Sequence, residues 1–517
     1  MLWTLIKNVA RKALHGAGDA AGNAALKAGM ACFNAGEFDA ARRHLSAALA
    51  AAPDDFDALY YLGLAEARSG HLDAAQRLLQ AAHAQCDHSA DLHNALGNVH
   101  RLRGQPDEAV ASYRRALEWD GDHVAALVNL GSCLRDQGRP EEALVVLEHA
   151  QRLAPHHVDA MFNKALALID TAESEPAFEL LERTLELDPD FAEAHTHLGF
   201  LLLRRGDFAA GWREYAWRVR TPEWSDQARY PYREWQGEPL SGKSILVRAE
   251  QGLGDQIMFA SCLPQVVSRA RRTIIESDPR LAKLFARSFP AAAVYRHRSR
   301  GDPDWLQEQA PDFQVYCGDL PRVLRNRNED FPRHDGYLEP DPALMAAWRA
   351  RLAELGPGIN IGISWRGGTP RTRQTARSLA LDALLPVLSL PGVNFVSLQY
   401  GQCSDEIASL RTRHGVRLHE WPQAIADMDE LAALTGSLNL VITVCTTVAH
   451  LSGALAQAAW IMVPVVAEWR YLEHGATLPW YPALRLFRQQ RRNEWSDVIA
   501  AVRVELQQRF SPSSAGA

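Results

Sequence analysis

The first part of the chain repeats one pattern of small, hydrophobic and polar positions every 34 residues. Hydrophobic residues recur at helical spacing in two stretches per period, with a short turn between them. Small residues allow two helices to pack closely, and a glycine in the turn can adopt positive φ. The pattern predicts six helical hairpins over residues 22–220, preceded by a capping helix over residues 1–21. Three series of small residues share the register: Gly29, Gly63, Gly97, Gly131, Ala165 and Gly199; Gly36, Gly70, Gly104, Gly138, Ala172 and Gly206; and Ala41, Ala75, Ala109, Ala143 and Ala177.

After a proline-containing linker at 221–241, short hydrophobic runs alternate with helical stretches. This alternation is typical of parallel, doubly wound sheets. The predicted fold class is therefore an α-solenoid followed by two Rossmann-like lobes, at residues 242–345 and 346–508, with a disordered tail at 509–517. The expected strands are Ser244–Arg248, Thr273–Glu276, Ala293–Tyr295 and Phe313–Tyr316 in the first lobe, and Ile359–Ser364, Val393–Leu398, Val416–His419, Leu440–Val444 and Trp460–Val463 in the second.

Composition narrows the class of protein. The net charge of −7 does not favour binding to nucleic acid, and no hydrophobic run approaches the roughly 20 residues of a membrane span. The 7 cysteines are scattered and form no CxxC pair, so neither a disulfide framework nor a zinc site is expected. A cytoplasmic protein without a metal or cofactor fits this composition best.

Ligands of doubly wound sheets bind beyond the carboxyl ends of the strands, and polar residues follow several predicted strands here. Arginines can pair with a diphosphate, and the start of the helix at Thr446 and Thr447 favours the same anion. Any one arginine alone is equally well explained as a solvated loop residue. The candidates are Gln251, Gly252, Gly254 and Asp255 after the first strand; Arg366, Arg371, Arg373 and Arg377; Gln399; and Cys445, Thr446, Thr447 and His450.

Several motifs resemble the catalytic half of bacterial tetratricopeptide-repeat glycosyltransferases. The repeat register itself resembles the tetratricopeptide repeat. The C-terminal half is similar to the lipopolysaccharide heptosyltransferase family, glycosyltransferase family nine, whose fold is GT-B, and the layout resembles that of O-GlcNAc transferase. The motifs are IGISWR at 361–366, RSL at 377–379, VSLQ at 396–399, VITVCTTVAHLSGA at 441–454 and WYP at 480–482.

The resemblance implies transfer of a sugar from a nucleotide sugar, without a metal. It makes Gly254-Asp255 the acceptor-side loop and Asp255 the general base, and it places Arg377 near the donor phosphate. His450 matches the histidine of the family's Asp-Thr-x-x-x-His segment. The aspartate of that segment is Cys445 in this chain.

This assignment accounts for the chemistry that such a transfer needs. Asp255 would deprotonate the acceptor hydroxyl, and Arg377, His450 and the helix start at Thr446 and Thr447 would stabilise the departing nucleoside diphosphate. Arg366 and Gln399 complete the expected donor site, and Gln251, Gly252 and Gly254 the acceptor-side loop. For Asp255 the alternative is a helix N-cap, and for His450 a histidine bonded within its own lobe. The groove of the repeats would bind a protein or peptide acceptor.

Two other functions remain open at this point. A repeat scaffold with a degenerate GT-B domain is consistent with Cys445. A nicotinamide-dependent oxidoreductase is suggested by Gly252-x-Gly254 and by Glu276 at the end of the next strand, although Ile257 stands where the third glycine of that motif belongs.

Overall fold

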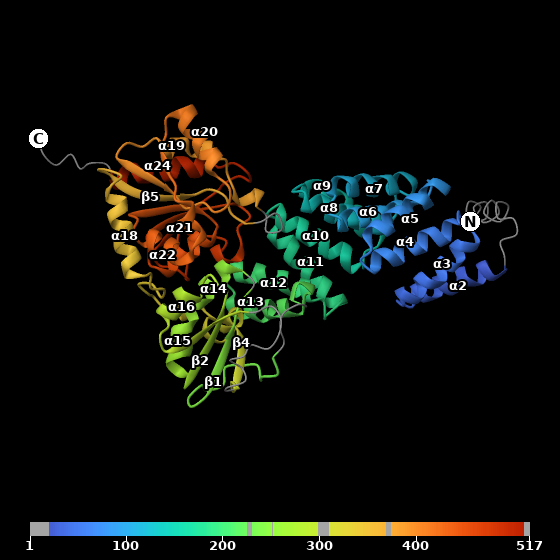
Figure 1. The fold of residues 1–517 in the computed structure, drawn as a ribbon, viewed down its shortest axis with the longest axis horizontal. Helices are drawn as coiled ribbons and strands as arrows, with labels where there is room; N and C mark the ends of the chain where they lie inside the picture. The colour runs from blue at the N-terminus through green and yellow to red at the C-terminus, as the bar shows by residue number, and fades with distance from the viewer. Residues whose placement is uncertain (1–19, 225–229, 251, 298–309, 369–373, 511–517) are drawn as a thin grey trace, which may run out of the picture. The chain divides into compact units, whose positions relative to one another are not determined.

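The computed structural model describes residues 20–224, 230–250, 252–297, 310–368 and 374–510. Contacts divide the chain into two units, Met1–Leu187 and Asp188–Ala517 (Figure 1). Most of the predicted capping helix lies outside the described residues, and so do residues 511–517 of the predicted tail. Arg509 and Phe510, which we assigned to that tail, instead form the last turn of a helix.

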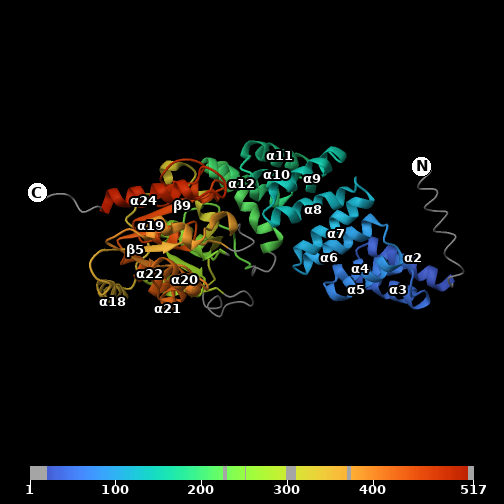
Figure 2. The ribbon, with the colours of Figure 1, turned by 90° about the horizontal axis from the view of Figure 1, so that it is seen from above.

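From residue 20 onward, the first unit contains five helical hairpins that follow one another along the chain (Figures 1 and 2). The helices are α2 (Ala20–Asn34), α3 (Phe38–Ala51), α4 (Phe56–Arg68), α5 (Leu72–Gln85), α6 (Ala90–Leu102), α7 (Pro106–Trp119), α8 (Val124–Asp136), α9 (Pro140–Leu153), α10 (Val158–Asp170) and α11 (Ser174–Leu187).

The small residues do what their register predicts. A Cβ atom added at Gly63 would lie 2.8 Å from Cγ of Leu79, and one added at Gly97 would lie 2.4 Å from the Tyr113 ring, so the two helices of a hairpin touch at these points. Gly70 in the turn has a φ of +82°. Ala172, at the equivalent turn of the fifth hairpin, has a φ of +71°, which is strained for a residue with a Cβ.

The sixth hairpin, α12 (Ala192–Arg205) and α13 (Phe208–Tyr215), belongs to the second unit. By register it is a repeat, since Gly199 and Gly206 continue the two glycine series. It is grouped with the sheets because Trp212 and Tyr215 are buried in the core that also contains Phe259 and Trp480. The first unit therefore ends one hairpin earlier than the boundary at residue 220 that the sequence predicts.

The first sheet of the second unit has four parallel strands in the order β3-β2-β1-β4. Part of the predicted linker packs beside it: Trp235 is buried, and its N–H donates to the carbonyl of Gln314 in β4. The strands are β1 (Ser244–Arg248), β2 (Arg272–Ser277), β3 (Ala292–Arg296) and β4 (Phe313–Tyr316), and the helices are α14 (Leu253–Phe259), α15 (Leu263–Arg269), α16 (Ala282–Ser288) and α17 (Leu320–Leu324). The next helix, α18 (Pro342–Ala353), packs against α22 (Met428–Gly436) beside the second sheet (Figure 1).

The second sheet has six parallel strands in the order β10-β9-β8-β5-β6-β7. The sixth strand, β10 (Leu484–Arg488), was not predicted; its hydrophobic residues alternate with arginines and it lies at the sheet edge. The others are β5 (Ile359–Ser364), β6 (Val393–Ser397), β7 (Leu418–His419), β8 (Leu440–Val444) and β9 (Ala459–Val463), with α19 (Leu385–Leu388), α20 (Ser404–His414), α21 (Pro422–Ala426), α22 (Met428–Gly436), α23 (Thr447–Ala454) and α24 (Ser496–Phe510).

No helix in the described part of the chain is both long enough and apolar enough to span a bilayer.

Candidate functional site

The loop after β1 and the loop after β8 meet where α14 packs against α23. A Cβ atom added at Gly254 would lie 3.0 Å from Cδ2 of His450 and 3.7 Å from Oγ1 of Thr447. Glycine at position 254 therefore permits the contact. The structure thus brings together Gly252, Gly254 and Asp255 of one sheet with Thr447 and His450 of the other.

Asp255 pairs with an arginine of the opposite sheet. The carboxylate accepts hydrogen bonds from Nε of Arg470, at 2.8 Å, and from Nη2 of the same guanidinium. Gly252 is the N-cap of α14, so the interpretation of Asp255 as the N-cap is wrong. The Asp255 side chain is 23% exposed, and water or a small ligand can therefore reach its carboxylate.

Four side chains of alternating charge, which we call the charge ladder, extend this pair: Asp255, Arg470, Glu468 and Arg377. Glu468 accepts from Arg470 at 3.1 Å through one oxygen and from Arg377 through the other. Burial alone would lower the pKa of Arg470, but the carboxylates of Asp255 and Glu468 outweigh it and raise that pKa. Arg470 therefore stays charged, and each of the two arginines is held by a carboxylate that an anionic ligand could replace.

His450 is buried and neutral. Its Nδ1 lies 3.0 Å from the hydroxyl of Tyr481. Burial, with a smaller effect of the nearby Arg470, lowers the pKa of His450 to about 3. It therefore carries no positive charge near neutral pH, and its contribution to anion binding is limited to a hydrogen bond.

The residues before His450 shape the start of α23. Thr446 is the N-cap, and its hydroxyl accepts from the N–H of Val448 at 3.2 Å. Cys445 is buried, and burial raises the pKa of its thiol to about 12. A protonated, enclosed thiol is a packing residue rather than a nucleophile.

Gln399 and Arg366 are held by the protein itself. The side-chain oxygen of Gln399 accepts from the backbone N–H groups of Trp365 and Arg366, at 2.9 and 2.8 Å, and its amide nitrogen donates to the carbonyls of Arg366 and Tyr400. Gln399 thus ties together the loops after β5 and β6. The Arg366 guanidinium pairs with Glu406 at 2.9 Å.

A cavity of about 540 Å³ adjoins these loops. Leu253 and Arg280 line it from the first sheet, and Tyr400, Trp421 and Thr447 are among its residues from the second. It therefore lies beyond the carboxyl ends of parallel strands, next to α14 and α23, and combines aromatic surface with polar groups as small-molecule sites do.

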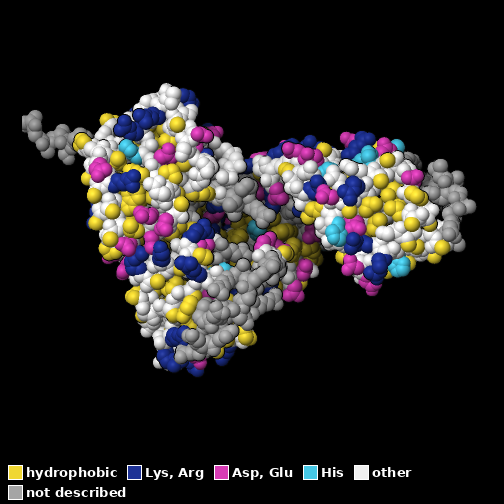
Figure 3. Space-filling model, viewed as in Figure 1, with side chains coloured by type: hydrophobic (Ala, Val, Ile, Leu, Met, Phe, Trp, Pro, Cys, Tyr) yellow, Lys and Arg dark blue, Asp and Glu magenta, His cyan; other side chains and the backbone are white. Residues whose placement is uncertain are grey.

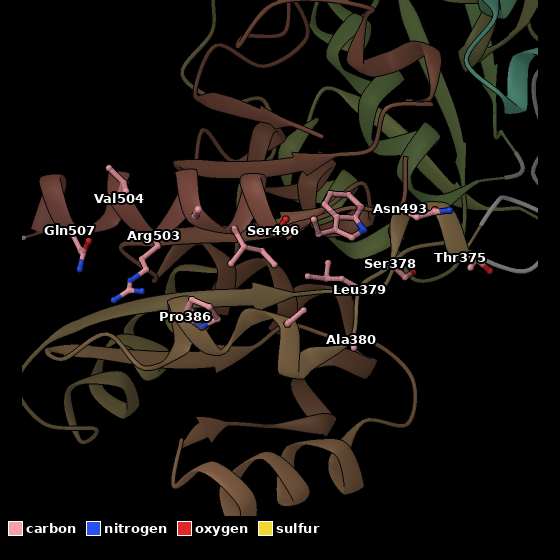
Figure 4. Close-up of a pocket in the computed structure, with 14 residues that line it drawn as sticks. Thr375, Ser378, Leu379, Ala380, Pro386, Asn493, Ser496, Arg503, Val504 and Gln507 are labelled. Atoms are coloured by element: carbon pink, nitrogen blue, oxygen red, sulfur yellow. The ribbon is translucent and has the colours of Figure 1, made fainter. Parts of the chain in front are cut away.

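A second cavity, of about 950 Å³, lies along α24 (Figure 4). Figure 4 shows Ser496 and Val504 on the side of α24, and Leu379 and Pro386 opposite. Apart from Arg503 its lining is uncharged. None of the charge ladder lines either cavity, but the candidate residues Gln399 and Thr447 line the smaller one and not the larger. We therefore place the candidate site at the smaller cavity.

Sequence reasoning missed Arg470 and Glu468. Both follow β9 after a short loop, at the same sheet edge as His450, so inspection of the residues further beyond Val463 could have found them. Gln251, Arg371 and Arg373, which were also candidates, lie outside the described residues.

The residues that a dinucleotide-binding site or a metal site would need can be located in the structure. Glu276, the candidate ribose-binding acid of a dinucleotide fold, is buried and accepts from the hydroxyl of Tyr230 at 2.8 Å. Within the described ranges, no group of three or more His, Cys, Asp or Glu side chains is placed to hold a metal ion.

Known families and proteins match parts of the chain. Families described as tetratricopeptide repeat match residues 101–169, and residues 26–90 and 67–120. Residues 26–169 are therefore tetratricopeptide repeats. Protein FlbA of Caulobacter vibrioides is 34% identical over 322 residues, which take in 59% of this chain and 53% of FlbA. The chain thus spans about half the length of that relative, and the match must include part of the second unit, because the first ends at Leu187.

Solved structures also resemble part of the chain. YrrB, described as a repeat protein with an unusual peptide-binding site, is 23% identical, and the match covers 34% of this chain and 97% of YrrB with a TM-score of 0.29. MamA is 21% identical, with 34% and 94% covered and a TM-score of 0.29. PilF of Pseudomonas aeruginosa is 18% identical, with 40% and 93% covered and a TM-score of 0.35.

Proposed function

We propose that the second unit is a glycosyltransferase of GT-B type that moves a sugar from a nucleotide sugar to a protein acceptor bound by the repeats. One observation carries the proposal: Asp255, a carboxylate of one parallel sheet, pairs with Arg470 of the other, and Glu468 links Arg470 to Arg377. Near this group, Leu253, Gln399 and Thr447 line a cavity of about 540 Å³. This arrangement places a candidate base next to two arginines that could bind an anion.

The donor occupies the cavity in this proposal. Tyr400 and Trp421 offer aromatic surface to a base, and the phosphate lies toward Arg377 and Arg470. Neutral His450 adds a hydrogen bond at most. The two arginines stabilise the leaving nucleotide without a metal, because they are already fixed by Glu468 and need little reorganisation.

The acceptor hydroxyl approaches Asp255 in this proposal. Arg470 occupies Oδ1 of Asp255 with two hydrogen bonds. A phosphate that takes Arg470 as its partner frees one oxygen of Asp255. Donor binding thus activates the base, and the hydroxyl proton moves to Asp255 as the bond from the acceptor oxygen to the sugar forms and the bond to the leaving phosphate breaks.

Glu468 can supply the carboxylate that is missing at Cys445, where the resembling family has an aspartate. The carboxylate of Glu468 is close enough to contribute to the raised pKa of the Cys445 thiol, after the larger effect of burial. A carboxylate therefore remains at this corner of the site, although it comes from the loop after β9 and not from the end of β8.

The repeats supply a surface for a protein acceptor. Phe56, Tyr60 and Tyr61 of α4 are partly exposed and lie in contact with one another, with ring centroids 5.3 to 6.0 Å apart in neighbouring pairs. A cluster of hydrophobic side chains is visible over α4 in Figure 3. Such aromatic surface fits an acceptor with hydrophobic side chains.

A scaffold without turnover is the second candidate, and the Asp255–Arg470 pair favours it if no ligand can separate the two groups. A screen of nucleotide sugars by thermal stabilisation tests the proposal. Free ligand at about 100 times its dissociation constant adds about 2.7 kcal/mol, which is easily seen as a higher melting temperature. Stabilisation by one nucleotide sugar that is reduced in Arg377→Ala supports the enzyme, and no stabilisation by any nucleotide sugar supports the scaffold.

A further inference from the structure

The sixth hairpin packs against the elements that carry both residues of the Asp255–Arg470 pair. The ring of Trp212 in α13 lies 6.3 Å from Phe259, the last residue of α14, and 5.4 Å from Trp469, the neighbour of Arg470. Tyr215 contacts the same two rings, at 6.3 and 5.7 Å. These four rings are buried and form one cluster. The cluster fixes the spacing between α14 and the 3₁₀ helix η10 (Trp469–Tyr471).

An arginine just after α13 holds the loop before Asp255. Arg218, in the 3₁₀ helix η1 (Ala216–Arg220), donates to Glu250 at 2.5 Å and to Asp319 at 2.7 Å. Arg218 and Glu250 side chains are each only 5% exposed. Gly318 permits this approach, because a Cβ atom there would lie 2.1 Å from the Glu250 carboxylate.

Glu250, which is held by Arg218, is in turn bonded to a residue of α14. Its carbonyl accepts from the side chain of Gln256 at 2.6 Å, and it precedes by two residues Gly252, the N-cap of the helix. The side chain of Gln256 in α14 is therefore tied to the backbone of Glu250, and the carboxylate of Glu250 is tied to Arg218.

A second arginine of the hairpin holds the loop after Arg470. Arg204 in α12 donates to the carboxylate of Glu473 at 3.0 Å, and the carbonyl of Arg204 accepts from the N–H of Glu473 at 2.8 Å. Glu473 follows Arg470 by three residues. The two loops of the candidate site are thus anchored to the same helical pair.

We propose that Arg218 and Arg204 are positioning residues, through which α12, α13 and η1 set the placement of Asp255 against Arg470. The sixth hairpin then supports the candidate site, and it is not part of the repeat surface that would bind a protein acceptor. For transfer this inference rests on the proposed function, but the placement of the loops does not depend on it.

Hydrogen exchange of the full chain tests the placement. The variant Arg218→Met with Glu250→Gln removes the two most buried charges at nearly constant volume, and only Asp319, whose side chain is 16% exposed, loses its partner. We expect exchange of the amides at residues 252–256 to rise about tenfold, since their opening no longer breaks a charged hydrogen bond. Exchange in residues 22–187 should stay unchanged. Arg213→Met, at an exposed position of α13, is the control and should change neither region.

Unchanged exchange at 252–256 in the folded double variant overturns the inference, and so does an equal rise over the whole second unit, which would show general stabilisation only. If the double variant does not fold, Arg218→Lys and Glu473→Gln replace it. Each should raise exchange only at its own loop, 252–256 or 468–473. A rise at both loops, or at neither, contradicts the separate positioning roles.

A second readout separates positioning from folding when transfer can be measured. The Arg218→Met, Glu250→Gln variant should lose at least about tenfold in kcat, because the base is misplaced, with the Kd for nucleotide sugar changed less than about threefold. If kcat and the affinity for nucleotide sugar fall by the same factor, the positioning role is overturned. Should the wild-type chain transfer no sugar, the proposed function fails, and the exchange experiment still decides the inference.

Discussion

Asp255 and Arg470 form an ion pair between the two parallel sheets of the second unit. Asp255 follows β1 and Arg470 follows β9, 215 residues later in the chain. Both side chains are mostly buried, at 23% and 15% exposed. A pair in this place couples the relative position of the two sheets to the availability of the carboxylate.

Loss of Arg470 should destabilise the second unit. Arg470→Gln leaves the largely buried carboxylates of Asp255 and Glu468 short of a partner, and we expect the free energy of unfolding to fall by about 1 to 3 kcal/mol. Denaturant titration followed by near-ultraviolet circular dichroism measures it. The control Arg485→Gln removes an exposed pair with Glu505, for which about 1 kcal/mol or less is expected. Equal losses in the two variants would mean that the Asp255–Arg470 pair has no special importance.

Stability should depend on pH through His450. Its pKa is about 3 in the folded chain, against 6.5 ordinarily, so below pH 6.5 the unfolded chain binds a proton that the folded chain does not. The contribution to stability is therefore complete above pH 6.5 and falls as the pH drops toward 3, by about 1.4 kcal/mol per pH unit. His450→Gln should remove this part of the slope. His414→Gln, at an exposed position of α20, should leave it unchanged, and an identical slope in all three proteins would refute a buried neutral His450.

Phosphate recognition should reside in Arg377. Arg377→Ala is expected to weaken binding of the nucleotide product by about 1.5 to 3 kcal/mol and binding of the matching nucleoside much less, because only the nucleotide carries phosphate. Titration calorimetry with both ligands gives the two losses. Arg413→Ala, which breaks an exposed pair with Asp382, should affect neither. Similar losses for nucleotide and nucleoside would place Arg377 outside the phosphate site.

The repeats and most strands could be predicted from the sequence because each depends on local pattern. The glycine series at Gly29 and Gly36 reports helix contact and positive φ directly, and nine of the ten strands have hydrophobic runs that are visible without the fold. The strand β10 was missed because Arg485 and Arg488 interrupt its hydrophobic positions at the sheet edge.

The pairing of charges in the ladder could not be predicted, because it depends on which loops meet. Asp255, Arg377 and His450 were candidates because each lies in the polar segment that follows a predicted strand. Arg470 stands seven residues after Val463, and only the packing of η10 against α13 and α14 turns it toward Asp255. That the sixth hairpin belongs to the second unit could not be predicted for the same reason. Gly199 keeps the repeat register, but Trp212 is buried by residues such as Arg325, which lies more than a hundred positions away in the chain.

A truncated chain that begins at Asp188 should fold and keep the donor site, whereas one that begins at Thr221 should not. The second deletion removes Trp212, Arg204 and Arg218, and so exposes Phe259 and Trp469 and leaves Glu250 as a buried unpaired charge. Thermal unfolding and nucleotide-sugar binding are measured for both truncated chains. The chain from Asp188 should no longer modify a protein acceptor, because the repeats that would bind it are gone. Full modification by this chain would make the first unit dispensable and point to a small acceptor.

Transfer itself is the most direct test of the account. The full chain is incubated with the nucleotide sugar that stabilises it and with proteins of its own cell, and mass spectrometry records both nucleotide release and the mass added to protein. The wild-type chain should add one sugar mass to a protein for each nucleotide released. Asp255→Asn should still bind the donor but transfer the sugar at least about 100-fold more slowly, as expected for a lost general base. A rate in Asp255→Asn equal to that of the wild type would contradict the role of Asp255, and no transfer by the wild-type chain with any nucleotide sugar would contradict the assignment as a glycosyltransferase.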